Sequence, residues 1–279
     1  MSRTLQTFVR QELSSNDTWE LSDLMKSVLR CQIYRLPKRE VSETNTRYPE
    51  KPDQMRAFLV KFFTRHYFQT QNSFVEYMTS IDFLNILKSG RLRILDIGSG
   101  PAVSSLAITD LVAHILEHLQ NIRKWSRSKA LRITYVLNDT SNICLGTGQN
   151  MLAHYFRVSG NQKRVIVCDR IIRIQNAFPR NLNQLRRVRL KLGEYDIATL
   201  SYVLVPLNED VKRSDLVDGL LKIEHICSEN GRILILQDRF QRSLIQQISL
   251  ALGKPIKKKL RGQDYCQYIT FTKLHSCIF

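Results

Sequence analysis

Hydrophobic positions follow a helical spacing through the first ninety residues. After the polar stretch that ends at Asp17, apolar side chains recur every three or four residues, at Leu21, Leu24, Met25, Val28 and Leu29. This spacing predicts an amphipathic helix. A second stripe, Met55, Phe58, Leu59, Phe62 and Phe63, follows the polar, proline-containing segment 42–53, and a further helix is expected over 73–88. Residues 1–90 are therefore expected to form a helical N-terminal extension or lid.

The pattern changes at residue 91, where short apolar runs begin to alternate with amphipathic stretches. Strands are predicted over 92–97, 132–139, 164–171, 194–207 and 231–238. Helices are predicted over 104–119, 141–156 and 214–231, and residues 263–275 show β-rich alternation. Strands that alternate with helices imply a mostly parallel sheet with crossover connections. We therefore expect an α/β domain over residues 91–279.

Composition narrows the class of protein. The chain has 279 residues, of which 43% are hydrophobic, so a substantial core is expected. No apolar run reaches the roughly 18 residues of a membrane span, and the N-terminus lacks the apolar core of a secretory signal. The six cysteines form no CxxC pair and no zinc-type spacing. We expect reduced thiols, no metal and no membrane contact in a cytoplasmic protein, with an organelle as the alternative.

The net charge of +17 is unevenly distributed. Residues 1–90 hold 13 Lys/Arg and 10 Asp/Glu, whereas residues 91–279 hold 29 and 15. A basic excess of this size favours a polyanionic partner, of which nucleic acid, and RNA in particular, is our first expectation. The alternative is that each basic run is simply a solvated face. The candidate phosphate contacts are Arg123, Lys124, Arg186, Arg187, Lys257, Lys258 and Lys259.

The stretch RILDIGSGPAVSSLAI places two glycines where a predicted strand meets a predicted helix. Glycine permits positive φ and lets a ligand approach the main chain, because no Cβ intervenes. The free N–H groups of a helix N-terminus favour a phosphate or a carboxylate. A dinucleotide fingerprint would need a third glycine at Val103, and the GxxxxGK[ST] loop is absent. The turn therefore predicts a ligand site of another kind.

The run Asp96-Ile97-Gly98-Ser99-Gly100 resembles motif I of the class I S-adenosylmethionine-dependent methyltransferases. Ala102 stands where that family usually has a third glycine. The resemblance implies a Rossmann-like class I methyltransferase sheet, mostly parallel with a C-terminal antiparallel strand. It also implies S-adenosylmethionine as the cofactor, held by Asp96, Gly98, Ser99 and Gly100.

Three further polar residues match the family pattern at strand ends. Asp139 ends the second strand, where an acid can accept hydrogen bonds from both ribose hydroxyls. A turn aspartate that caps the next helix is the alternative, and both roles are compatible. Asp169 matches the position that often faces the adenine amine, although a simple surface aspartate fits as well. Ser201 lies in DIATLSYVLVPL, which resembles the motif IV region beside the cofactor and substrate.

The sequence identifies no catalytic residue. SYVLVP stands where amino-methylating relatives carry [DNS]PP[YFW], and no cysteine lies in 195–210 or 232–240 for covalent base-carbon methylation. The stretches DTSNICLGTG, LSYVLVPL and ILILQDRFQRSL are also faintly similar to the methyltransferase-like proteins of the small ribosomal subunit. Some of those proteins bind a cluster through cysteines that are missing here. Three functions remain open: a methyltransferase for RNA or a ribonucleoprotein, a small-molecule or protein methyltransferase, and an inactive methyltransferase-like RNA-binding scaffold.

Overall fold

The molecule is built around one seven-stranded sheet. The computed structural model describes residues 20–37, 48–125, 130–159, 165–202, 213–238, 242–254, 256–261 and 264–271. The strand order is β3-β2-β1-β4-β5-β7-β6. The strands are β1 (Arg91–Ile97), β2 (Leu131–Asp139), β3 (Ile166–Gln175), β4 (Tyr195–Ser201), β5 (Cys227–Asp238), β6 (Lys257–Arg261) and β7 (Asp264–Phe271). The first five run parallel, whereas β7 is antiparallel to both β5 and β6.

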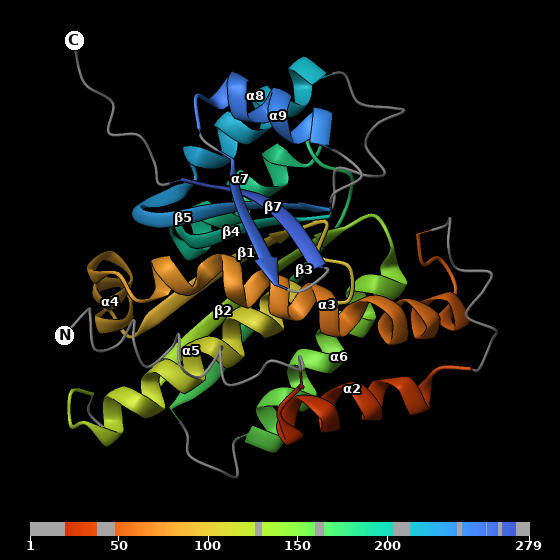
Figure 1. The fold of residues 1–279 in the computed structure, drawn as a ribbon, viewed down its shortest axis with the longest axis vertical. Coiled ribbons are helices and arrows are strands. Elements are labelled where there is room, and N and C mark those ends of the chain that lie inside the picture. The colour runs from red at the N-terminus through yellow and green to blue at the C-terminus, as the bar shows by residue number, and fades with distance from the viewer. Residues whose placement is uncertain are drawn as a thin grey trace.

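Helices cover both faces of the sheet. They are α2 (Asp23–Arg35), α3 (Pro52–Met78), α4 (Ile81–Lys88), α5 (Val103–Asn121), α6 (Asn142–Ser159), α7 (Leu182–Leu192), α8 (Arg213–Glu224) and α9 (Arg242–Leu252). Helices α2 to α6 lie on one face and α7 to α9 on the other (Figure 1). The predicted α/β fold is confirmed: the sheet is Rossmann-like, mostly parallel, and ends in antiparallel strands.

The N-terminal helices follow the predicted apolar stripes, with one correction. Residues 73–88 are not a single helix, because α3 continues to Met78 and α4 begins at Ile81. The break falls at Thr79 and Ser80, where the Ser80 hydroxyl accepts a hydrogen bond from the Phe83 N–H and caps α4. The polar pair therefore ends one helix and begins the next.

Three boundaries in the second half also differ from the prediction. Helix α8 ends at Glu224 and β5 already begins at Cys227, before the glycine that was expected to separate them. Strand β3 extends to Gln175, beyond its predicted end at residue 171. Helices α7 and α9 and strand β6 were not predicted, although the sequences of both helices carry apolar residues at helical spacing.

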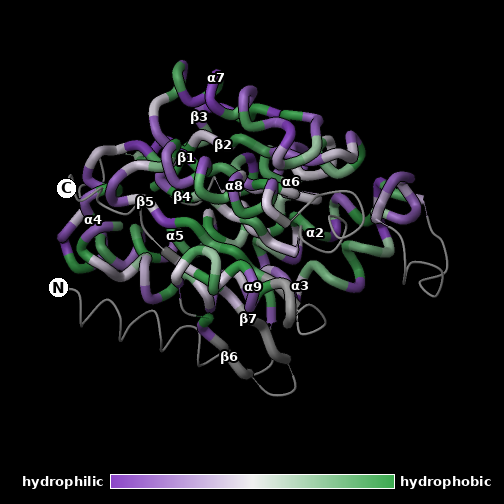
Figure 2. The backbone as a smooth tube through the Cα atoms, turned by 90° about the horizontal axis from the view of Figure 1, so that it is seen from above, coloured by the Kyte–Doolittle hydropathy of each residue, from purple (hydrophilic) through white to green (hydrophobic). Residues whose placement is uncertain are grey.

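The N-terminal extension and the sheet share one hydrophobic core. Side chains of α2, α3 and α4 pack with those of α5, α6 and the strands in a single cluster, in which Met25, Leu59 and Leu106 are fully buried. A second cluster lies between the opposite sheet face and α7, α8 and α9. Figure 2 shows hydrophobic residues concentrated in the interior and hydrophilic runs on α7 at the edge. The described part of the extension is thus an integral layer, and its role as a lid stays a prediction.

No described helix has both the length and the apolar character needed to cross a bilayer. Cys31, Cys144, Cys168 and Cys227 are free thiols in this part of the chain. No group of histidine, cysteine and acidic side chains among the described residues could hold a metal ion.

Candidate functional site

Sheet register brings three of the predicted site residues to one level at the carboxyl edge. Ile97 of β1 pairs with Asn138 of β2 on one side and with Leu200 of β4 on the other. The next residues along these three strands, Gly98, Asp139 and Ser201, therefore meet at the same edge. Strand order reverses between β1 and β4, and α/β sheets bind ligands in the crevice outside such a reversal.

The glycine turn has the strained backbone that its sequence predicts. Gly98 and Gly100 have φ values of 62° and 52°, and Ala102, which caps α5, lies in the same left-handed region at 59°. The Ala102 N–H donates to the Ser99 carbonyl at 2.8 Å, and the Ser99 N–H donates to the Asn138 carbonyl at 2.9 Å. These bonds tie the turn to β2. A Cβ is tolerated at Ala102 only at a conformational cost, since the left-handed region disfavours side chains.

Asp96 turns inward, away from the glycine turn. Its side chain is 1% exposed. One oxygen accepts from the Thr199 hydroxyl of β4 at 2.6 Å, and the other accepts from the Ser105 hydroxyl of α5 at 2.7 Å. Burial raises the pKa of Asp96 to about 6, although these hydrogen bonds oppose the rise. Asp96 therefore clamps β1 to α5 and β4, and its support of the turn is indirect.

Asp139 faces the glycine turn. Its Oδ2 accepts from the Gly100 N–H at 2.8 Å, and its Oδ1 accepts from the Ser141 N–H at 2.8 Å. The carboxylate is 3% exposed, and burial raises its pKa while the hydrogen bonds from Tyr48, Ser141 and Gly100 pull it down. The bond to Ser141 is the helix-turn contact that was expected as an alternative role. Asp139 thus joins the glycine turn to the start of α6.

Tyr48, from the N-terminal extension, completes the surroundings of Asp139. Its hydroxyl donates to Asp139 Oδ2 at 2.5 Å. The same hydroxyl oxygen lies 3.7 Å from the position that a Cβ on Gly100 would take. Tyr48 therefore lies directly over the turn and the acid that were predicted to hold the cofactor.

The predicted place of Asp169 at the end of the third strand is wrong. Because β3 continues to Gln175, Asp169 lies in the first half of the strand, at an irregularity in the pairing beside Ile133 and Thr134. Six residues separate it from the strand end, which is about 20 Å of extended chain. Its carboxylate instead forms an ion pair with Arg132, which lowers its pKa. Asp169 is the surface aspartate of the alternative interpretation.

Ser201 lies at the end of β4, near polar atoms that lack hydrogen-bond partners among the described residues. Its hydroxyl oxygen is buried and has no hydrogen-bond partner among the described residues. Tyr202 follows with a φ of 61°, donates from its hydroxyl to Gln69 Oε1 of α3, and stacks on His66 with ring centroids 3.7 Å apart. Gln69 is 4% exposed, and its Nε2 has no partner in the described part of the chain.

His66 of α3 lies against Tyr202 at the end of β4. Burial, with a smaller effect of Arg65, lowers the pKa of His66 to about 3, so the imidazole is neutral. The left-handed backbone of Tyr202 is costly for an aromatic residue, and such strain concentrates at functional positions. Together with the unpartnered Ser201 hydroxyl and Gln69 amide, it marks the carboxyl end of β4 as a candidate polar contact surface.

Several residues of the edge were not predicted. Gln175 and Asn176 end β3 beside Asp139, and the Asn138 amide donates to the Asn176 carbonyl at 2.8 Å. The Asn-Asp pair at the end of β2 was visible in the sequence, but the true end of β3 was not. Tyr48 and Gln69 carried no sequence signal, since they reach the site from elements far away along the chain.

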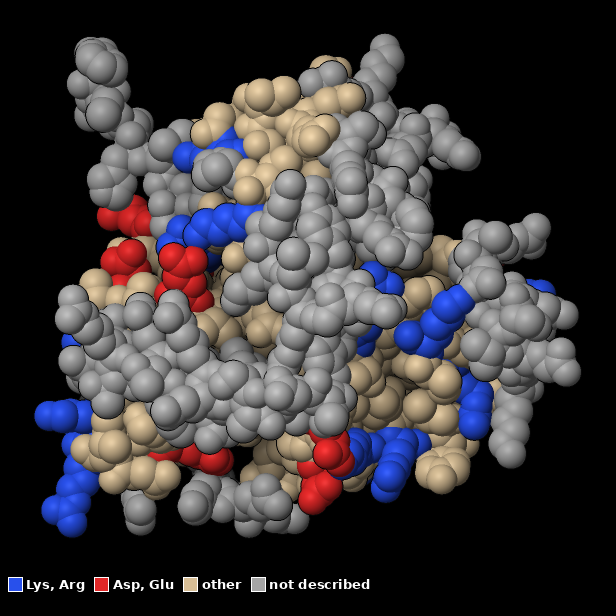
Figure 3. All heavy atoms as spheres, viewed as in Figure 1, with Lys and Arg blue, Asp and Glu red and all other residues tan. Residues whose placement is uncertain are grey.

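The basic runs do not converge on one surface. Arg123 and Lys124 follow the C-terminal end of α5, Arg186 lies on α7 across the sheet, and Lys257 opens the edge strand β6. The Lys257 ammonium pairs with Glu76 at 2.9 Å. On the face drawn in Figure 3, the visible basic side chains form separate small groups with acidic ones among them. The side chains of residues 258 and 259 lie outside the described part.

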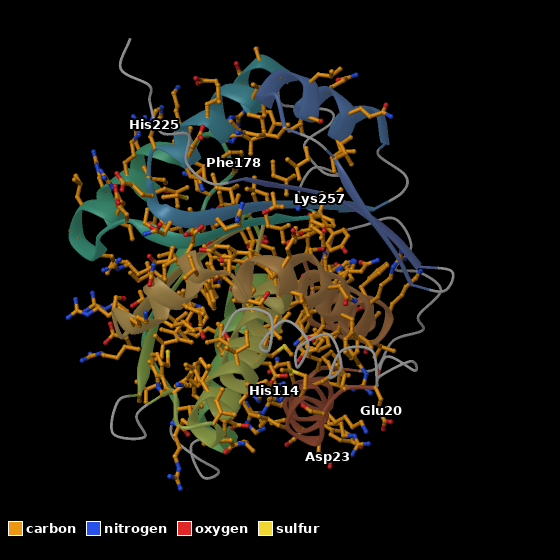
Figure 4. All side chains as sticks on the ribbon, turned by 60° about the vertical axis from the view of Figure 1, so that its left-hand side comes forward. Glu20, Asp23, His114, Phe178, His225 and Lys257 are labelled. Atoms are coloured by element: carbon orange, nitrogen blue, oxygen red, sulfur yellow. The ribbon has the colours of Figure 1, made fainter. Side chains whose placement is uncertain are left out.

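A groove lies elsewhere, between α2 and α6. It has a volume of about 510 Å³ and is lined by Asp23, Lys26, Ser27, Arg30, Cys31 and His154. His154 is twelve residues beyond the start of α6, about 18 Å along the helix from the carboxyl edge. Figure 4 places Asp23 on the opposite side of the sheet from Phe178 of the β3–α7 connection. The groove is therefore separate from the glycine turn.

Comparison with known proteins gives likenesses of structure only. No protein-family model and no curated protein sequence matches the chain. A putative S-adenosylmethionine-dependent methyltransferase from Methanococcus maripaludis is 13% identical, with 87% of this chain and 100% of that chain covered and a TM-score of 0.42. The ribosomal protein L11 methylase from Lactobacillus delbrueckii is 14% identical, with 71% and 80% covered and a TM-score of 0.37.

Human N-acetylserotonin methyltransferase, solved in complex with S-adenosylmethionine, is 14% identical, with 90% of this chain and 67% of that chain covered and a TM-score of 0.35. At these identities the likeness concerns the fold alone.

Proposed function

We propose that the protein is an S-adenosylmethionine-dependent methyltransferase whose cofactor binds at the carboxyl edge, beside the strand-order reversal. One observation carries this proposal: the Gly98–Gly100 turn and the Asp139 carboxylate are joined by a 2.8 Å hydrogen bond at that edge. A glycine turn before a helix N-terminus offers N–H donors, and a carboxylate offers acceptors. A nucleoside with an amino-acid tail presents an anionic carboxylate and ribose hydroxyl donors, so it needs both kinds of group.

Different residues of the carboxyl edge would contact different parts of the cofactor and the acceptor. The turn and the first N–H groups of α5 would bind the anionic end of the cofactor, and Asp139 would bind the ribose hydroxyls. The cofactor, when bound, supplies an electrophilic methyl group on a sulfonium, and the protein mainly aligns the acceptor with it. Ser201, Gln69 and Tyr202 would line the acceptor side, since they adjoin the turn across β4.

We further propose an acceptor on RNA or a ribonucleoprotein. The support is charge: the net charge is +17, and Arg186 and Arg187 of α7 are exposed without an ion pair to any described residue. Because the basic runs are dispersed, each would contribute separately to binding. A small-molecule or protein acceptor would leave this charge without a role, and a scaffold without turnover would bind RNA but transfer no methyl group.

Calorimetric titration with S-adenosylmethionine and S-adenosylhomocysteine tests the cofactor. ATP serves as the control ligand, because it shares adenosine but lacks the amino-acid tail. We expect micromolar binding of the first two and at least about tenfold weaker binding of ATP. Folded protein that binds neither sulfur ligand would refute the proposal.

Tritium transfer from labelled S-adenosylmethionine tests the acceptor. The acceptor fractions are RNA, ribosomal particles, protein and small metabolites. The RNA proposal predicts label in the first two fractions and loss of that label in an Arg186→Ala/Arg187→Ala variant at moderate salt. Label only in metabolites or protein would refute it, and salt-dependent RNA binding without transfer would identify a scaffold.

A further inference from the structure

Tyr48 occupies the side of Asp139 that the proposed function assigns to the cofactor. Its hydroxyl lies 2.5 Å from Asp139 Oδ2 and adjoins Gly100. The contact joins residues 91 positions apart in the chain. A phenol hydroxyl that donates to a carboxylate makes the same kind of bond as a ribose hydroxyl. The N-terminal extension therefore places its own donor where a cofactor donor would bind.

The acceptor capacity of Asp139 is almost filled. A carboxylate has about four lone-pair positions. Oδ2 accepts from Tyr48 and from the Gly100 N–H, and Oδ1 accepts from the Ser141 N–H. About one position is left, whereas the two neighbouring hydroxyls of a ribose donate two hydrogen bonds. The ribose and Tyr48 therefore cannot both be satisfied by Asp139.

Steric access gives the same result. Asp139 is 3% exposed, so a ligand cannot reach the carboxylate while Tyr48 covers it. Burial, with Asp139 next in size, raises the pKa of Tyr48 far above its ordinary value, so the hydroxyl keeps its proton and remains a donor. The contact is thus maintained over the whole physiological pH range.

Packing and hydrogen bonds together hold the segment of residues 48–50 in place: Pro49 is buried, and Tyr48 packs against the main hydrophobic cluster. The Pro49 carbonyl accepts from the Ser141 hydroxyl at 2.8 Å and from the Cys144 thiol at 3.9 Å. On its other side, Gln54 Oε1 accepts from the Glu50 N–H at 2.9 Å, at the start of α3. Besides this packing, hydrogen bonds that can open and re-form hold the segment to α3 on one side and to α6 on the other.

We propose that Tyr48 is an internal competitor of the cofactor, and that the segment of residues 48–50 must leave Asp139 before the ribose can bind. This inference rests on the proposed function. The observed structure is the closed state, and the apparent affinity for the cofactor is reduced by the fraction of molecules in that state. A change that weakens the Tyr48–Asp139 bond must therefore strengthen cofactor binding.

Calorimetric titration of S-adenosylhomocysteine into wild type, Tyr48→Phe and Tyr34→Phe tests this competition. Tyr34→Phe is the matched control, because Tyr34 is 80% exposed. We expect Tyr48→Phe to bind about tenfold more tightly than wild type, the effect of losing one hydrogen bond to a charged group. Tyr34→Phe should bind as wild type does. Unchanged or weaker binding by folded Tyr48→Phe would overturn the proposal.

A second measurement covers the case in which Tyr48→Phe is too unstable to titrate. Hydrogen exchange of the wild-type Glu50 and Lys51 N–H groups should accelerate at least about threefold when S-adenosylhomocysteine saturates the protein. Slower or unchanged exchange would overturn the competition. Binding that fails in every folded variant would refute the proposed function itself, whereas equal binding by wild type and Tyr48→Phe refutes the competition alone.

Discussion

The ends of β1 and β2 carry two buried acids with opposite surroundings. Asp96 is bonded entirely from within the domain, by Thr199 of β4 and Ser105 of α5. Asp139 is bonded by the glycine turn and by Tyr48 of the N-terminal extension. Burial raises the pKa of both carboxyl groups. Burial and a raised pKa therefore do not distinguish the two acids, whereas the origin of their hydrogen-bond partners does.

Of the substitutions that test this comparison, Asp96→Ala is expected to have the largest effect on stability. The substitution leaves the Thr199 hydroxyl, the Ser105 hydroxyl and the Ser105 N–H without their buried acceptor. We expect the free energy of unfolding to fall by about 3 kcal/mol in urea titrations. A loss below about 1 kcal/mol would show that Asp96 does not clamp the sheet.

The difference in pH-dependent stability between wild type and Asp96→Asn should have the sign of a raised carboxyl pKa. Its pKa is about 6 in the folded protein, against an ordinary value of 3.8. Between these values the folded state binds more protons than the unfolded state, so stability falls as pH rises. From pH 4.5 to 7.5, wild type should lose about 2 kcal/mol relative to Asp96→Asn in unfolding titrations. A difference of opposite sign would contradict the burial of this charge.

Alanine substitutions at Gly146 and Gly148 of α6 test how closely this helix packs on the turn that follows β1. A Cβ on Gly148 would lie 2.8 Å from the Ala102 Cβ, whereas a Cβ on Gly146 would meet nothing within 4 Å. Gly148→Ala should lower the free energy of unfolding by about 1 kcal/mol, since the clash exceeds the gain in helix propensity. Gly146→Ala should raise it by about the same amount, and equal effects would contradict the close packing of α6 on the turn.

The smallest effect is expected from Asp169→Asn. This substitution breaks an exposed ion pair with Arg132, and exposed pairs contribute little to stability. We expect a change below about 0.5 kcal/mol and no change in S-adenosylmethionine affinity by calorimetry. A marked loss of affinity would return Asp169 to the cofactor site.

The sequence allowed the sheet to be predicted, together with those residues of its carboxyl edge that stand at the ends of predicted strands. Alternating apolar runs mark strands, and a glycine pair or an acid at a strand end marks the carboxyl edge, so Gly98, Gly100, Asp139 and Ser201 were placed together correctly. Asp169 was misplaced because the exposed edge strand β3 alternates poorly beyond residue 171.

Tyr48 and Gln69 lay beyond prediction because they act through tertiary contacts. Tyr48 meets Asp139 across 91 residues, and Gln69 meets Tyr202 across 133. Both belong to the N-terminal extension, whose apolar stripe predicts helices but not which polar side chains face the sheet. Apolar periodicity therefore predicts which side chains of the N-terminal helices form the core. It does not predict which of their polar side chains reach the site.

The most direct test of the account compares S-adenosylmethionine binding to Asp139→Asn and Asp96→Asn by calorimetry. The account predicts a loss of at least about 100-fold for Asp139→Asn, because a charged acceptor of the ribose is removed. It predicts a change within about threefold for folded Asp96→Asn, since Asp96 does not face the ligand. Equal affinities for the two variants, or a larger loss in Asp96→Asn, would contradict it.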